Sequence, residues 1–355
     1  MLTDIFAYRY LKYPIWTAYT EAERRLLNQT ISLAKEMFPC YRGSGSERKK
    51  IETNETKWQL IHDRLARELG VGELSPLYYS GQQKNGFGVD VPVSWAFDWE
   101  HVCATFVSAP PTASTLDVDM FIKERISFIE LTMRLREEEL TMPDPPLAKT
   151  MAELDIKHRL AKGPQLPANL VDRLTIAKMQ QRAIFEAQVD ELNERFRRAG
   201  APLTFHNGFI QVSQDELVEQ QIATPFWRLV ADSMWANVDV DMKEALDRRD
   251  SNDKDPAIFA AKALESAIKI VSGHKGWTRG IENGAAAYID NLVSKNNEGF
   301  LAVWEGDILK DYFRKVRNSL GHGPGPERMP ELSPAQTDWA IETAMSWIRS
   351  LIRRM

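Results

Sequence analysis

Apolar residues recur at helical spacing along most of this chain. Residues 17–41, 55–68 and 117–140 repeat apolar side chains every three to four positions among charged ones, which is the pattern of an amphipathic helix. The interval 169–199 continues this pattern with many charges and stops at Gly200. The spacing therefore predicts a helical N-terminal part followed by one long charged helix.

Two stretches interrupt the helical pattern. Asn207 and Gly208 lie between two short apolar runs, which predicts a type I′ β-hairpin. Between residues 86 and 106, valines and aromatic residues alternate as in a strand, yet the tryptophans also fit one face of a helix. Since Pro92 is incompatible with a central strand, we expect a helix from about Ser94 onward.

The C-terminal part carries further helical stripes. We expect helices over residues 213–236, 239–249, 255–271, 281–294, 308–318 and 333–353. The third of these begins with Asp255 as N-cap and Pro256 in the first turn. Its apolar stripe consists of Ala257, Ala261, Leu264, Ile268 and Val271. Several such helices joined by short loops predict an antiparallel bundle.

These elements predict a mainly α fold with three parts. A helical N-terminal domain covers residues 1–145 and ends at a proline cluster. A helical connector with a short β-hairpin covers residues 146–212. The C-terminal antiparallel bundle covers residues 213–355.

Composition and charge narrow the functional classes. The 43% hydrophobic and 27% charged residues are ordinary for a soluble globular protein. A net charge of -5 argues against nucleic-acid binding by the whole surface but leaves room for a local basic patch. Cys40 and Cys103 are far apart and predict two buried free thiols rather than a disulfide or a zinc site. Without a leader pattern or a long apolar run, we expect a cytoplasmic protein with no membrane partner.

The most informative stretch is Arg317-Asn318-Ser319-Leu320-Gly321-His322. On a continuous helix, Arg317 and His322 would point about 140° apart. However, Gly321 and the following GPGP sequence end the helix near residues 318–320. His322 can then fold back toward the helix end that carries Arg317.

These residue types suit phosphodiester chemistry without a metal. The imidazole of His322 titrates near neutral pH and can act as acid or base, which contributes about 10²- to 10⁴-fold to a rate. Arg317 can hold a phosphate and stabilise charge that grows in the transition state, and Asn318 can hold either partner. The alternative is an ordinary helix end with a cation, a glycine stop and a surface histidine.

The motif resembles the Arg-x4-6-His signature of the HEPN superfamily, in which Asn commonly follows Arg. The surrounding segments DPAIFAAKALESAIKIVSG and IENGAAAYIDNLV, with HGPG and a final apolar helix, resemble the abortive-infection C-terminal domain over about residues 235–355. The segments MLTDIFAYRY and TEAERRLLNQTISLAKE resemble the N-terminal domains of AbiJ-type abortive-infection proteins. The segment ELNERFRRAGAPLTFHNGFIQV resembles their connector.

The resemblance implies a metal-independent endoribonuclease of prokaryotic anti-phage defence, with no cofactor. It implies a homodimer through the HEPN domain of residues 213–355, in which two copies of the motif face each other. The RNA would be tRNA or mRNA, cleaved by attack of the 2′-hydroxyl with His322 as acid and base. From the domain order alone, we expect the N-terminal domain to act as a sensor or regulator that responds to a regulatory protein or a phage trigger.

Four further residues enter as supporting positions. Glu265 is similar to an acidic position of this family that orients the Arg or His. Its alternative role is an i,i+4 ion pair with Lys269. Arg314 and Lys315 are weaker RNA-binding candidates beside the motif. The alternative function for the whole chain is a non-catalytic HEPN module that binds nucleotides or a protein in a defence or toxin–antitoxin system.

Other polar motifs favour structural roles. The fragments Asp117-Val118-Asp119 and Asp239-Val240-Asp241 each open a predicted helix, so we expect capping rather than a metal site. His274 is expected in an exposed turn. The N-terminal tyrosines and Trp16 are expected to pack in an aromatic cluster rather than to stack on bases.

Overall fold

The computed structural model describes two compact units. The described residues are 4–43, 47–84, 86, 88–112, 115, 117–141, 169–213, 215–318 and 332–355, with the backbone alone for 169–175, 216 and 318. Unit 1 consists of Met1–Tyr8 and Pro14–Ile210, and unit 2 consists of Arg9–Tyr13 and Gln211–Met355. Residues 169–210 of the predicted connector therefore lie in unit 1.

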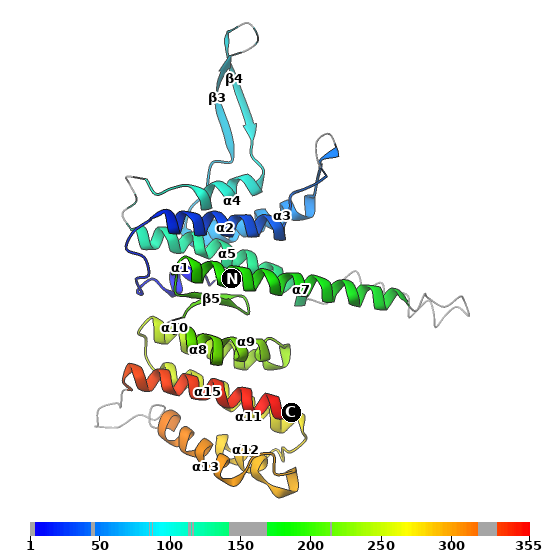
Figure 1. The fold of residues 1–355 in the computed structure, drawn as a ribbon, viewed down its shortest axis with the longest axis vertical. Helices are drawn as coiled ribbons and strands as arrows, with labels where there is room; N and C mark the ends of the chain where they lie inside the picture. Colours follow the sequence, from blue (N-terminus) through cyan, green and yellow to red (C-terminus); the bar gives the residue numbers. More distant parts are fainter. Residues whose placement is uncertain are drawn as a thin grey trace, which may run out of the picture. The chain divides into compact units, whose positions relative to one another are not determined.

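Unit 1 is built around helix α5 (Val118–Thr141), which is buried on almost every side. Around it pack α2 (Glu21–Met37), α3 (Glu52–Leu69), α4 (Trp99–Ser108) and α7 (Asn169–Arg198) (Figure 1). α2 begins with a capping box, in which the amide of Thr20 donates to the Glu23 carboxylate at 2.7 Å. α3 ends at Gly70 in the left-handed conformation, as its sequence predicts. The described helices confirm the mainly α fold.

Three antiparallel hairpins complete the strand content of the described residues. They pair β1 with β2 (Tyr41–Arg42, Lys49–Lys50), β3 with β4 (Tyr78–Lys84, Asp90–Ala96) and β5 with β6 (Leu203–His206, Phe209–Val212). Asn207 and Gly208 both have positive φ, at 44° and 82°, so the predicted β-hairpin at these residues is confirmed.

The expectation of a helix from Ser94 was wrong. β4 continues to Ala96, and α4 begins at Trp99 after Asp98, whose carboxylate accepts a hydrogen bond from the His101 amide at 2.8 Å. A two-stranded ribbon has no central strand, so Pro92 is tolerated opposite Gln82. The alternation of valine and tryptophan was the decisive signal.

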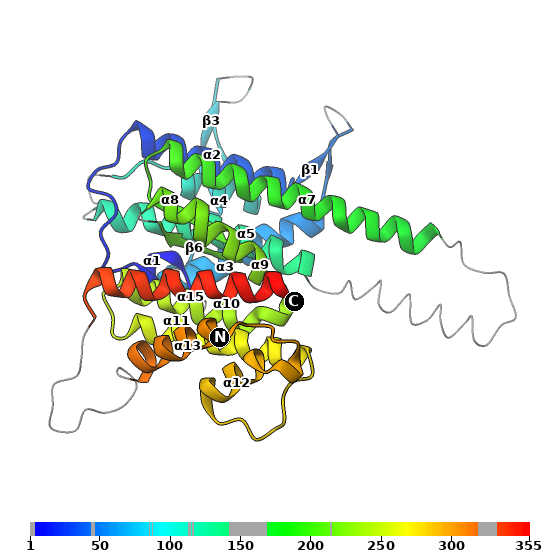
Figure 2. The same ribbon diagram turned by 60° about the horizontal axis from the view of Figure 1, so that its bottom comes forward.

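Unit 2 is a helical bundle around α11 (Pro256–His274). This helix packs against α10 (Ala236–Asp250), α12 (Gly284–Val293) and α15 (Pro334–Arg354) (Figure 2). The predicted apolar stripe of α11 is buried throughout. The shorter elements are α1 (Phe6–Arg9), whose last residue belongs to unit 2, α8 (Glu216–Val218), η2 (Glu219–Ala223), α9 (Thr224–Val230), η3 (Ser233–Trp235), η4 (Lys295–Asn297), α13 (Val303–Tyr312) and η5 (Phe313–Asn318).

Helix boundaries in unit 2 differ from the prediction where local hydrogen bonds decide them. α13 begins at Val303 rather than at residue 308, because the Ala302 amide donates to the Glu305 carboxylate at 2.9 Å. α12 begins at Gly284, three residues later than expected. Asp255 precedes α11 with a φ of 60°, and its side chain does not make the expected capping hydrogen bond.

A buried polar network ties Arg9–Tyr13 into unit 2. The hydroxyl of Tyr10 lies 3.0 Å from Asp247 Oδ1 and 3.2 Å from Asp250 Oδ2. Arg249 lies 2.7 Å from Asp250 Oδ1. Burial of Asp250 raises the pKa of its carboxyl to about 6, even though Arg249 opposes the shift.

The described part of the chain bears on three further expectations. Cys40 and Cys103 are both buried and free, as predicted. No helix in this part combines the length and the apolar content needed to cross a membrane. Tyr10 and Trp16 are buried, as the expected aromatic packing requires, whereas Tyr8 is 44% exposed and departs from it.

Candidate functional site

Arg317 lies at the end of a helix that changes its winding. α13 continues directly into the π-helical segment η5, and such segments are rare and often occur at functional sites. The hydroxyl of Tyr312 donates to the Ala340 carbonyl of α15 at 2.9 Å. Phe313 and Val316 are buried in the bundle core. The backbone that carries Arg317 is thus fixed from within the bundle.

Glu265 on α11 is the buried centre of a three-residue ion cluster. Its Oε2 lies 3.0 Å from the Arg317 guanidinium, and its Oε1 lies 2.8 Å from the Lys269 Nζ. The Glu265 side chain is only 8% exposed, whereas Arg317 is 36% and Lys269 is 46% exposed. A nearly buried carboxylate therefore holds two cations whose side chains are partly exposed to solvent.

In this arrangement, Arg317 can still bind an anion. A guanidinium has five N–H donors, and the contact with Glu265 uses only part of them. Its planar fork suits the two oxygens of a phosphate. Glu265 therefore contacts both Arg317 and Lys269, the two partners that the sequence offered as alternatives.

Tyr288 of α12 also borders this cluster. The Lys269 Nζ lies 5.7 Å from the centre of its ring, within the range of a cation–π contact. Sequence reasoning missed Tyr288, and no motif around it would have singled it out. Its place beside the cluster follows from the packing of α12 on α11.

The other sequence-predicted site residues fall into two groups. Arg314 and Lys315 lie on the exposed side of η5, and Arg314 pairs with Asp311 at 2.6 Å. Asn318 ends η5, where the backbone alone is described. His322 lies outside the described residues. The structure thus brings together Glu265, Lys269 and Arg317, and the placement of His322 remains a prediction.

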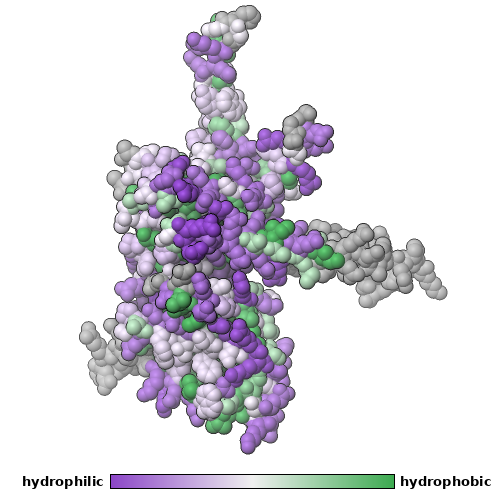
Figure 3. All heavy atoms as spheres, viewed as in Figure 1, coloured by the Kyte–Doolittle hydropathy of each residue, from purple (hydrophilic) through white to green (hydrophobic). Residues whose placement is uncertain are grey.

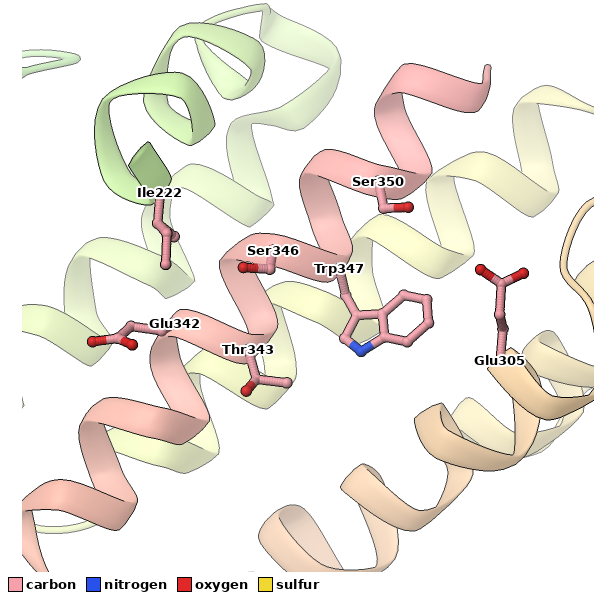
Figure 4. A pocket seen from close by; sticks show the side chains of 7 residues that line it. All are labelled: Ile222, Glu305, Glu342, Thr343, Ser346, Trp347 and Ser350. Atoms are coloured by element: carbon pink, nitrogen blue, oxygen red, sulfur yellow. The ribbon is translucent and has the colours of Figure 1, made fainter. Parts of the chain in front are cut away.

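A shallow pocket in unit 2 has the wrong chemistry for a phosphate. It has a volume of about 390 Å³ and is lined by Ile222, Glu305, Glu342, Thr343, Ser346, Trp347 and Ser350 (Figure 4). Its ionisable lining groups are two carboxylates, of which Glu305 pairs with Arg354 at 2.7 Å. Burial, together with nearby Asp338, raises the pKa of Glu342. Because carboxylates repel an anion, this pocket is not a candidate for a phosphate-binding site.

Neither Asp-x-Asp fragment forms part of a metal-binding cluster in the described residues. Asp117 caps α5 by accepting from the Met120 amide at 3.0 Å, as expected. The capping expectation was wrong for the second fragment, because α10 begins at Ala236 and Asp239 instead pairs with Lys243 at 2.5 Å. His274 is exposed, but at the last position of α11 rather than in the turn.

The comparisons with known proteins concern mainly the N-terminal part. A family model described as AbiJ N-terminal domain 4 matches residues 4–228. This match spans unit 1 and continues through α8 and η2 into α9. No curated protein and no solved structure matches the chain.

Proposed function

The chain belongs to the AbiJ family of abortive-infection proteins, and from this membership we propose that unit 2 is its effector, a metal-independent endoribonuclease of the HEPN type. Membership assigns the chain a role in abortive-infection defence. The nuclease activity, the RNA substrate and the dimer are parts of the proposal.

One observation carries the proposal. Arg317 is held by buried Glu265 at a solvent-facing end of the bundle, and His322 follows five positions later in the sequence. A guanidinium that served only as a helix-end charge would not need a nearly buried carboxylate on another helix. Such a partner fixes the direction of the guanidinium before an anion arrives, which is the preorganisation that transition-state stabilisation requires.

The chemistry follows from these residue types. His322 takes the proton from a ribose 2′-hydroxyl, and the 2′-oxygen attacks phosphorus as the bond to the 5′-oxygen breaks. A histidine returns a proton to the leaving 5′-oxygen. Arg317 stabilises the charge on the phosphoryl oxygens, and Asn318 orients a partner. The products are a 2′,3′-cyclic phosphate and a 5′-hydroxyl.

A homodimer supplies the second acid–base group. Each chain offers one His322, whereas transesterification is helped by both a base and an acid. A two-fold dimer through residues 213–355 brings two copies together. The substrate in this proposal is tRNA or mRNA, and unit 1 acts as the sensor or regulator.

An RNA cleavage assay in EDTA tests the activity. We expect cleavage by the wild type under activating conditions and a loss of about 10²-fold or more in His322→Ala and in Arg317→Ala. His274→Ala and Arg353→Ala are matched controls, because both replace exposed residues at helix ends of unit 2. End-group analysis should find 2′,3′-cyclic phosphate.

Two outcomes would contradict the nuclease. One is equal cleavage by the wild type and both site variants. The other is no cleavage by any of them while the wild type still binds nucleotides or a partner protein, which would favour a non-catalytic HEPN module. Sedimentation measurements test the dimer separately, since a monomer at concentrations that support cleavage would contradict a composite site.

A further inference from the structure

The β3–β4 ribbon of unit 1 lies apart from the helical core. Its seven residue pairs run from Tyr78↔Ala96 to Lys84↔Asp90, and the ribbon projects away from α4 (Figure 1). Most of its residues are exposed on both faces. Figure 3 shows hydrophilic side chains toward its tip. An isolated two-stranded ribbon is marginally stable in water, and this one also exposes the large side chains of Tyr78, Tyr79 and Trp95, which marks it as a candidate interaction surface.

One face of the ribbon carries a preformed aromatic stack. Tyr79 and Trp95 are directly paired, with ring centres 4.4 Å apart and planes inclined by 26°. They are nevertheless 40% and 49% exposed. Gly81 makes room for this arrangement, because a Cβ there would lie 2.3 Å from the Tyr79 hydroxyl. Tyr78, on the opposite face, is 64% exposed.

The β1–β2 hairpin supplies positive charge. The stretch 41–50 contains four cations, Arg42, Arg48, Lys49 and Lys50, and one carboxylate, Glu47, so its net charge is +3 in a chain of net charge -5. The four cations are all exposed. This hairpin is thus a positively charged segment of a chain whose net charge is negative.

The bases of the two hairpins meet at the start of α4. The hydroxyl of Tyr41 donates to Asp98 at 2.9 Å, and Asp98 lies two residues beyond the end of β4. Glu55 accepts the Trp99 amide at 2.9 Å and pairs with Lys50 at 3.4 Å. Figure 2 shows both hairpins projecting from the same side of unit 1. The aromatic and cationic groups therefore lie on two hairpins that start from neighbouring positions on the same side of unit 1.

We propose that the β1–β2 and β3–β4 hairpins form a binding surface for single-stranded RNA. Flat exposed rings accept unpaired bases, and neighbouring cations track the phosphates. A duplex hides the faces of its bases, whereas cellular RNA exposes them in loops and single-stranded regions. A protein partner would account for the apolar side chains but not for the cationic hairpin beside them. This surface lies in unit 1 and does not depend on cleavage by unit 2.

Fluorescence anisotropy with a labelled, unstructured RNA of about 20 nucleotides tests the surface. The full chain carries His322→Ala in every sample, so that cleavage cannot consume the probe. We expect Trp95→Leu to weaken binding by about 5- to 150-fold, the range of one lost base–aromatic stack. Trp304→Leu, on exposed Trp304 of α13, is the matched control and should leave the affinity unchanged.

The cations are tested by salt dependence. The double variant Arg42→Gln, Lys49→Gln should weaken binding and reduce the slope of log affinity against log salt by about 1.4, if each cation contacts one phosphate. Lys254→Gln and Lys295→Gln, on exposed lysines of unit 2, are the controls. Absence of RNA binding by the parent, tighter binding of single-stranded or duplex DNA, or equal affinity of Trp95→Leu would each overturn the proposal.

Discussion

Two buried glutamates, one in each unit, show how the same side chain serves opposite purposes. Glu130 of α5 is fully buried and accepts from the amides of Phe6 and Ile210 at 3.2 and 2.8 Å, and from Arg134 at 2.9 Å. Glu265 of α11 is nearly as buried, but its described partners are two side-chain cations with solvent-exposed ends.

The difference lies in what each carboxylate fixes. Glu130 joins segments that are distant in sequence through their backbone, so its loss affects the fold of unit 1. Glu265 fixes the direction of Arg317 and Lys269, whose side chains are 36% and 46% exposed. We therefore expect replacement of Glu130 to change stability, and replacement of Glu265 to change chemistry.

The largest effect is expected for Glu130→Ala. This variant leaves two buried amides and the Arg134 guanidinium without their carboxylate, and breaking a buried ion pair typically costs about 3–5 kcal/mol. Denaturant unfolding and hydrogen exchange of α5 measure the loss. Glu138→Ala removes a more exposed carboxylate from the same helix and should cost less than about 1 kcal/mol. Equal losses in the two variants would remove the distinction between the glutamates.

The next largest effect on stability is expected at Asp250. This carboxyl is buried beside both Arg249 and a second carboxylate, Asp247. Its pKa is raised from 3.8 in the unfolded chain to about 6 in the fold. The folded protein therefore binds more protons between these values, and this group's contribution to stability is complete below about pH 4 and lost as the pH rises through 6. About two pKa units correspond to about 3 kcal/mol.

Hydrogen exchange of α10 peptides between about pH 4 and pH 7 tests this expectation. After correction for intrinsic exchange rates, the free energy of opening should fall with pH in the wild type and vary less in Asp250→Asn. Asp253→Asn, in the exposed loop after α10, is the control and should keep the wild-type slope. An unchanged slope in Asp250→Asn would show that another group titrates in this window.

A smaller effect, and a purely chemical one, is expected for Glu265→Gln. The amide keeps the size of the side chain but removes the charge that Arg317 and Lys269 share, so the guanidinium loses its fixed direction. We expect single-turnover RNA cleavage to slow by about 10- to 100-fold while stability changes by less than about 1 kcal/mol. Lys269→Gln keeps the Glu265–Arg317 contact and should cleave within about threefold of the wild type. Loss of stability without a change in the single-turnover rate would show that Glu265 has a structural role, like Glu130, and no role in the chemistry.

Much of the fold was predictable because local rules decide it. The α11 stripe, the glycine stop of α3 and the Asn207-Gly208 turn each follow from a few neighbouring residues. The β3–β4 ribbon was missed because its residues fit two periodicities. The choice between them depends on pairing with residues 78–84, which lie outside any short window.

The candidate site was predictable only in part, for a similar reason. The pairing of Glu265 with Lys269 follows from helical spacing alone. The contact between Glu265 and Arg317 joins residues 52 positions apart and depends on how η5 lies against α11. No periodicity carries that information. The π-helical winding of residues 313–318 was also unexpected, because the sequence pattern predicted an ordinary helix over residues 308–318.

The smallest effect is expected for Gly306→Ala, which tests how firmly helix α13 fixes the position of Arg317. A Cβ at Gly306 of α13 would lie 2.5 Å from Cγ2 of Val293, so Gly306→Ala forces α12 and α13 apart. Overpacking costs about 1–3 kcal/mol, and the gain in helix propensity returns about 1 kcal/mol, which leaves a net loss of about 1 kcal/mol. Adding Val293→Ala removes the clash, so the pair should show favourable coupling in a double-mutant cycle.

The effect of Gly306→Ala on the Glu265–Arg317 contact depends on whether α12 or α13 moves to relieve the clash. The end of α13 is fixed by the Tyr312 hydrogen bond to Ala340 and by the burial of Phe313 and Val316, whereas Val293 is the last residue of α12. α12 should therefore move, and Arg317 should stay against Glu265. RNA cleavage by Gly306→Ala should then remain within about twofold of the wild type, with faster hydrogen exchange confined to α12. Slower cleavage with faster exchange in residues 303–318 would show instead that Arg317 is only as fixed as α13, and that Glu265 alone does not hold it.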